Sequence, residues 1–155
     1  MIEDFKTAMK NEFEMSDLGL LNYFLGMEIN QQEEGISLSQ ECYAKKLLEK
    51  FNMKDCTSMR TPLVPQGKTQ SEEKEFADAQ VYRSLVGGLL YLTATRPDLM
   101  FSASYLSRYL KEPKVRHFKE VKRVLRYIQG TLNLGLMFTA VKEPRLIGYS
   151  DSDWG

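Results

Sequence analysis

Asp151 and Asp153 are the residues whose type and spacing most directly suggest chemistry. They stand two positions apart in the stretch 146–154, LIGYSDSDW, which has the pattern of a β-strand ending in polar residues. Side chains two positions apart on a strand point to the same face, and paired carboxylates at a strand end can hold Mg²⁺ for phosphodiester hydrolysis. A polar strand end entering a turn has the same pattern and is the more common case. Two-metal hydrolysis also needs carboxylates from neighbouring strands, so the pair alone predicts no functional catalytic site, metal site or cofactor.

A row of cations on the helix expected at 114–129 is the second candidate. The apolar residues of this helix follow the i, i+3, i+4, i+7 spacing of a buried stripe: Val121, Val124, Leu125 and Ile128. The candidate nucleic-acid contacts lie on another stripe and close to it: Arg108, Lys114, Arg116, His117, Lys119, Lys122, Arg123 and Arg126. Cations one turn apart can follow a phosphate backbone. A solvated helix face gives the same pattern, and a lone histidine is more often structural.

The same helix contains an Arg-x-Leu-Arg string, formed by Arg123, Val124, Leu125 and Arg126. Strings this short are common by chance. Because Val124 and Leu125 belong to the apolar stripe, we expect the string to be folded into the helix and not to act as an exposed signal.

Composition and charge limit the class of protein to which the chain can belong. The chain has 155 residues, 43% of them hydrophobic, which is typical of a globular domain and not of a disordered chain. Its net charge is zero, yet residues 1–80 carry 9 Lys and Arg against 15 Asp and Glu, and residues 81–155 carry 12 against 6. The basic second half is a candidate nucleic-acid surface. Two distant cysteines and one histidine give no zinc or disulfide pattern and suggest a reducing compartment.

The periodicity predicts an α+β fold. We expect an amphipathic helix at 2–14, a β-hairpin from strands at 23–29 and 36–39, and a helix capped by Ser39 that reaches Phe51. Residues 52–76 lack periodicity and contain Pro62, Pro65 and Gly67, which predicts a linker. Helices follow at 78–94, at 95–110 with Thr95 as cap, and at 113–129. The Gly87–Gly88 pair suggests close packing, and two short strands at 134–139 and 146–150 end the chain.

Ordered motifs along nearly the whole chain carry a resemblance to a known family. They are FEMSDLG (13–19), YFLGMEI (23–29), ISLSQ (36–40), YRSLVGGLLYL (82–92), TRPD (95–98), His117, KRVLRYIQGT (122–131) and GYSDSDW (148–154). Together they resemble the reverse transcriptase region of copia-type retrotransposon polyproteins. The resemblance implies a partial palm-like segment at 1–51, a linker at 52–76, a helical thumb- or connection-like region at 77–131 and the start of a truncated RNase H-like domain at 132–155.

This resemblance also implies what the chain lacks. Asp151 would match the first metal-binding aspartate of RNase H, with Asp153 beside it. The family's polymerase aspartates would lie upstream of Phe13 and the other RNase H carboxylates beyond Gly155, and no Asp-Asp pair occurs in the chain. We therefore expect a catalytically incompetent fragment, not an enzyme, in which both aspartates are vestigial and the basic helices retain weak nucleic-acid binding.

The expected partner is an RNA–DNA duplex or another nucleic acid, in the cytoplasm or nucleus. No signal peptide and no apolar run long enough for membrane insertion is visible in the sequence. The alternative is the oomycete RxLR effector family, secreted and delivered into plant host cells, where such a protein would bind a host protein and suppress cell death. Against this alternative, the string at 123–126 does not closely follow a signal peptide, and no Glu-Glu-Arg run comes after it.

Overall fold

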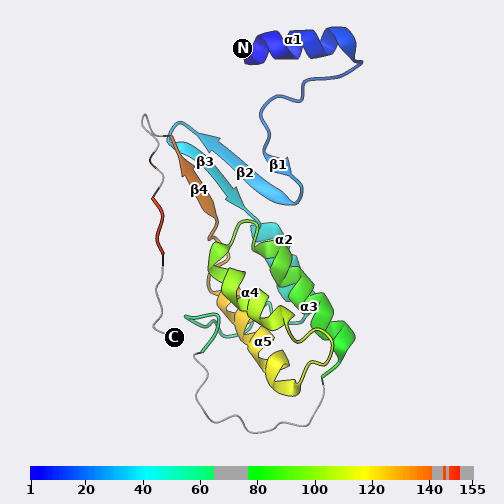
Figure 1. Ribbon diagram of the computed structural model, residues 1–155, viewed down its shortest axis with the longest axis vertical. Coiled ribbons are helices and arrows are strands. Elements are labelled where there is room, and N and C mark those ends of the chain that lie inside the picture. The colour runs from blue at the N-terminus through cyan, green and yellow to red at the C-terminus, as the bar shows by residue number, and fades with distance from the viewer. Residues whose placement is uncertain (65–76, 141–144, 146, 151–155) are drawn as a thin grey trace.

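A bundle of helices with a small sheet at one end makes up the molecule (Figure 1). The structure, a computed structural model, describes residues 1–64, 77–140, 145 and 147–150. Its elements are α1 (Ile2–Glu12), β1 (Tyr23–Phe24), β2 (Met27–Gln32), β3 (Gly35–Ser39), α2 (Glu41–Lys50), α3 (Ala79–Leu92), the 3₁₀ turn η1 (Pro97–Leu99), α4 (Met100–Ser107), α5 (Val115–Gln129) and β4 (Leu136–Thr139). The predicted α+β fold is confirmed.

The core lies between α2, α3, α4 and α5. On α5 the predicted apolar stripe is confirmed, because all four of its residues are fully buried: Val121, Val124, Leu125 and Ile128. Asp78 begins α3 because its carboxylate accepts hydrogen bonds from the backbone N–H groups of Gln80 and Val81, at 2.8 and 3.1 Å. A buried hydrogen bond ties α3 to α4, where the Tyr82 hydroxyl donates to the Leu106 carbonyl at 2.8 Å.

The predicted strand at 23–29 is wrong as one strand, because Leu25 and Gly26 form a tight turn inside it. Both residues have positive φ, 49° and 79°, which is the geometry of a two-residue type I′ hairpin turn. The turn pairs Phe24 with Met27. It is held against the bundle by Tyr91 of α3, whose hydroxyl donates to the Leu25 carbonyl at 2.6 Å. The predicted strand 23–29 is therefore two strands, β1 and β2.

The last strand of the sheet comes from the far end of the chain. β4 pairs antiparallel with β3, with Ile36 opposite Phe138 and Leu38 opposite Leu136. This confirms a strand within 134–139, although its partner was not predicted. Elements that the sequence assigns to the separate segments 1–51 and 132–155 thus share one sheet, and the segment boundaries themselves stay a prediction. Residues 147–150 carry no strand, so the strand predicted at 146–150 is wrong for these described residues.

The cap of α2 differs from the one predicted. Ser39 does not cap the helix; its hydroxyl donates to the Glu28 carboxylate at 3.1 Å. The other oxygen of Glu28 accepts from the backbone N–H of Cys42, in the first turn, at 2.8 Å. A carboxylate from β2 thus satisfies the helix terminus. Burial raises the pKa of Glu28, and hydrogen bonds from Cys42 and Ser39 outweigh this effect and lower it.

The first helix is separate from the core. No residue of α1 is buried, and its apolar stripe is largely exposed, with Ile2 at 71% and Phe5 at 63%. Figure 1 shows α1 standing apart from the bundle. Within the described part of the chain, no helix has the length and apolar character needed to cross a bilayer.

The Gly87–Gly88 pair in α3 gives a test of packing. A Cβ on Gly88 would lie 2.6 Å from Leu47 Cδ1, whereas a Cβ on Gly87 would meet nothing within 4 Å. We expect Gly87→Ala to raise the free energy of unfolding by about 1 kcal/mol through helix propensity. In Gly88→Ala the same gain is outweighed by overpacking against α2, which costs about 1–3 kcal/mol. Urea unfolding of both variants checks this order, and equal stabilities would contradict it.

Candidate nucleic-acid interface

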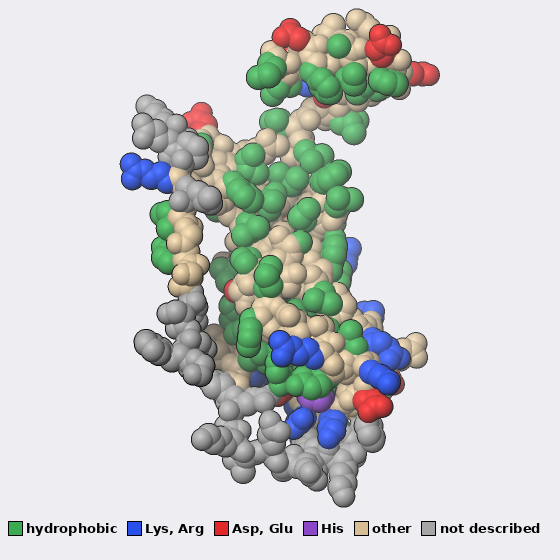
Figure 2. Space-filling view, in the orientation of Figure 1, with side chains coloured by type: hydrophobic (Ala, Val, Ile, Leu, Met, Phe, Trp, Pro, Cys, Tyr) green, Lys and Arg blue, Asp and Glu red, His purple; other side chains and the backbone are tan. Residues whose placement is uncertain are grey.

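The cations predicted to contact nucleic acid fall into three groups according to their surroundings. Lys119 and Lys122 on α5 and Arg108 at the end of α4 are exposed. The Lys122 ammonium lies 5.1 Å from the centroid of the Phe118 ring, a cation–π contact that leaves its charge at the surface. Figure 2 shows Lys and Arg side chains gathered toward the lower end of the bundle, beside a largely apolar face. These three side chains reach the solvent.

Arg123 and Arg126 are half-buried and hold another part of the chain. Arg123 Nη2 donates to Thr61 Oγ1 at 2.9 Å, and Arg126 Nε donates to the Thr57 carbonyl at 2.6 Å. The backbone N–H of Met59 also donates to the Arg126 carbonyl at 3.1 Å. Residues 57–61 of the predicted linker therefore lie along α5, and both arginines have a structural role that the sequence did not indicate.

His117 is a structural residue of the helix start. Its side chain is 2% exposed, and its ring stacks on Tyr109 with centroids 3.7 Å apart. The Nδ1 atom accepts a hydrogen bond from the backbone N–H of Lys114 at 3.0 Å, and Arg116 Nε lies 3.2 Å from Nε2. The half-buried Lys114 and Arg116 thus surround an imidazole that packs into the bundle. The structure favours the structural reading of this lone histidine.

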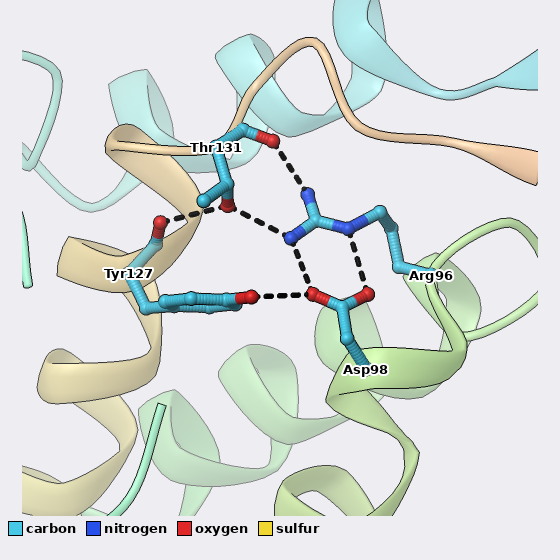
Figure 3. Close-up of polar contacts among 4 residues, drawn as sticks. All are labelled: Arg96, Asp98, Tyr127 and Thr131. Atoms are coloured by element: carbon cyan, nitrogen blue, oxygen red, sulfur yellow. Dashed lines mark hydrogen bonds and ion pairs between the residues drawn. The ribbon is translucent and has the colours of Figure 1, made fainter. Parts of the chain in front are cut away.

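A polar network joins the start of α4 to the end of α5 (Figure 3). The Arg96 guanidinium makes a two-pronged contact with Asp98, with Nε–Oδ1 at 2.9 Å and Nη2–Oδ2 at 2.7 Å. It also donates to the carbonyl and the hydroxyl oxygen of Thr131, each at 2.8 Å. The Tyr127 hydroxyl completes the network by donating to Asp98 Oδ2 at 2.8 Å. Arg96 is 3% exposed, so the guanidinium is buried with its partners in place.

The helix cap and the helix end predicted for residues 95–110 differ from those in the structure. Thr95 does not cap the next helix; its buried hydroxyl donates to Gln40 Oε1 at 2.9 Å. α4 also ends at Ser107 and not at 110. Asp98 accepts hydrogen bonds from Arg96 and Tyr127. Burial raises the pKa of Asp98, but the hydrogen bonds from Arg96 and Tyr127 and the charge of Arg96 outweigh burial and lower it. The sequence did not predict that Arg96 and Tyr127 both bond to Asp98, although both residues fall in the motifs quoted above.

The remaining candidates are the two aspartates near the end of the sequence and the Arg-x-Leu-Arg string. Asp151 and Asp153 lie outside the described residues. Within the described ranges, no group of three or more His, Cys, Asp and Glu residues could hold a metal ion. The Arg-x-Leu-Arg string is folded into α5, as expected, with Val124 and Leu125 fully buried.

Comparison with known proteins gives matches along most of the chain. Residues 1–65 match the family described as reverse transcriptase (RNA-dependent DNA polymerase). An uncharacterized mitochondrial protein of Arabidopsis thaliana is 37% identical over 146 residues, which cover 94% of this chain and 61% of that protein. A retrovirus-related Pol polyprotein from a Nicotiana tabacum transposon is 37% identical over 163 residues, covering 99% of this chain and 12% of the polyprotein.

A third relative matches only part of the chain. It is a secreted RxLR effector protein of Plasmopara viticola, 46% identical over 74 residues, which cover 47% of this chain and 52% of that protein. The chain thus spans less than two thirds of the length of each of these three relatives. No solved structure matches the chain.

Proposed function

Because the chain is related to the reverse transcriptase region of copia-type retrotransposon polyproteins, as its motifs predicted, we propose that it binds nucleic acid through the exposed cations of α5. The observation that carries the proposal is the exposure of Lys119 and Lys122, which stand one turn apart on a helix whose opposite stripe is buried. Arg108 adds a third exposed charge at the end of α4. Such a row neutralises successive phosphates and releases their counterions on binding.

The proposal assigns binding, and not bond-breaking, to these 155 residues. Nucleotide transfer and RNA hydrolysis by two metal ions need several carboxylates that converge on one site. The sequence contains no Asp-Asp pair, and Asp151 and Asp153 are two carboxylates from one short stretch. We expect no primer extension and no cleavage of an RNA–DNA hybrid by the purified chain with Mg²⁺. Either activity at a rate above a buffer control would contradict this part of the proposal.

A charge-reversal pair tests the binding. In Lys119→Glu/Lys122→Glu, the affinity for a fluorescent RNA–DNA duplex is expected to fall by about tenfold or more at low salt. The slope of log affinity against log salt is expected to shrink by about 2, one per lost phosphate contact. Fluorescence anisotropy at several salt concentrations measures both quantities. Arg123 and Arg126 are left unchanged because their loss would also release residues 57–61.

The matched control carries the same change of charge elsewhere. Lys10 on α1 and Lys46 on α2 are exposed, so Lys10→Glu/Lys46→Glu alters the net charge equally without touching α5. This control is expected to keep most of the affinity. Absence of binding by the unmodified chain at low salt would overturn the proposal, and so would an equal loss in both double variants.

The partial match to a secreted effector favours a second candidate function, in which the chain binds a protein of a plant host cell and suppresses cell death. The burial of Val124 and Leu125 weighs against a signal role for the string at 123–126. Expression in plant cells together with a cell-death elicitor tests this candidate. Cell death that proceeds unchanged would exclude it.

A further inference from the structure

A groove with aromatic walls lies beside the cations of α5. It has a volume of about 590 Å³ and is bounded by residues 62–64, by the α4 region and by α5. Phe101 and Tyr105 of α4 form its aromatic side, and Asp98, Glu120 and Arg123 are its charged residues. Most ligand-sized hollows of this kind combine apolar walls with a few polar groups that orient the ligand. The groove is large enough for a nucleobase.

The aromatic side of the groove is open to solvent. The Phe101 side chain is 73% exposed, which is high for a large apolar residue. Its ring is nearly parallel to that of Tyr105, with an interplanar angle of 17° and centroids 6.4 Å apart. Tyr105 is half-buried, so Phe101 is the exposed ring of the pair. Unpaired bases stack on exposed aromatic rings, and such stacking tolerates any base because each has a π-face.

A second hollow continues the first along α5. It has a volume of about 460 Å³ and includes the exposed Lys119 and Lys122. The two hollows share Glu120 and Arg123, so they meet at the middle of α5. At this junction the buried Nε of Arg123 has no hydrogen-bond partner among the described residues. The aromatic hollow and the basic hollow thus lie next to each other on α5, on either side of Glu120 and Arg123.

We infer that this track takes single-stranded nucleic acid, with one unpaired base against Phe101 and Tyr105 and the neighbouring phosphates over Lys119 and Lys122. The side chains that line only one hollow set this direction. Phe101 and Tyr105 line only the first hollow and offer ring faces on which a base stacks, whereas Lys119 and Lys122 line only the second. Phosphates therefore belong over the lysines of the second hollow. A continuous duplex keeps its bases stacked inside and cannot place one in the groove.

This inference rests on the proposed function and names its preferred ligand. The test compares a fluorescent single-stranded oligonucleotide with an RNA–DNA duplex of the same length. Phe101→Ala is expected to weaken single-strand binding by about 5- to 150-fold, the range for removal of one stacking ring, and to change duplex binding by less than about twofold. Phe101→Trp is expected to restore the single-strand affinity. With 2-aminopurine in the strand, binding is expected to quench its fluorescence, and Phe101→Ala to remove the quenching.

Phe5→Ala is the matched control, because Phe5 on α1 is a similarly exposed phenylalanine at 63% and lies outside both hollows. It is expected to leave both affinities unchanged. If the duplex binds and Phe101→Ala leaves single-strand binding unaffected, the inference is overturned while the proposed function stands. If neither ligand binds at low salt, the proposed function fails, and this inference fails with it.

Discussion

Arg96→Ala is expected to lower the free energy of unfolding by about 3 kcal/mol, the lower end of the range for removing one partner from a buried ion pair, because the Asp98 side chain is 34% exposed. Arg96 is 3% exposed and makes four hydrogen bonds to Asp98 and Thr131. Its removal leaves a carboxylate and a carbonyl without these donors at the point where α4 meets α5. Urea unfolding followed by circular dichroism measures the loss. A change below about 1 kcal/mol would contradict the role assigned to this network.

Two further measurements make the first prediction specific. Arg96→Lys keeps the charge but cannot reproduce the two-pronged contact, so an intermediate loss is expected. Asp98 has a lowered pKa when folded, so its contribution is present above its unfolded pKa of about 4 and is lost as the pH falls through the folded value. In Arg96→Ala this acid dependence is expected to be weaker. An unchanged pH profile would show that Arg96 does not hold the pKa of Asp98 down.

Leu125→Ala is expected to cost about 2–5 kcal/mol, the range for truncation of a buried leucine. Leu125 is 0% exposed and belongs to the α5 stripe in the core. The result matters for the effector candidate, because Leu125 is also the leucine of the Arg-x-Leu-Arg string. An alanine scan of that string would disrupt the fold, and a lost activity would then say nothing about a signal.

The control for this prediction is Leu90→Ala on α3. Leu90 is 43% exposed, so its truncation removes little buried surface and is expected to change stability by about 0.5 kcal/mol or less. Differential scanning calorimetry of the two variants gives the comparison. Similar transition temperatures would mean that α5 is not packed as described.

The sequence predicted the elements whose stability is local. The α5 stripe has a clear helical period, and both ends of that helix lie within two residues of the prediction. The α3 helix was predicted equally well, since its Asp78 cap is made by residues next to it in sequence. The caps proposed for Ser39 and Thr95 failed for a different reason. Both side chains bond to groups that only the folded chain brings near, Glu28 and Gln40.

The same distinction between local and fold-dependent features applies to the candidate site. The sequence identified the row of cations on α5, because charge and period can be read from residue types alone. It could not tell Lys119 and Lys122, which are exposed, from Arg123 and Arg126, which hold residues 57–61. It also gave no sign of the groove, because Pro62, Phe101 and Glu120 come from three separate stretches that meet only in the fold.

The pairing of β3 with β4 sets an order of events during synthesis of the chain. Ile36 leaves the ribosome early, yet its partner Phe138 is made about a hundred residues later. At roughly 5–20 residues per second, that interval lasts on the order of 5–20 s. Throughout it, the outer edge of β3 presents unpaired backbone groups, the usual starting point for association between chains. Among the described strands, the β3 edge is therefore covered late, and holding newly made chains apart matters most before residue 140 has emerged.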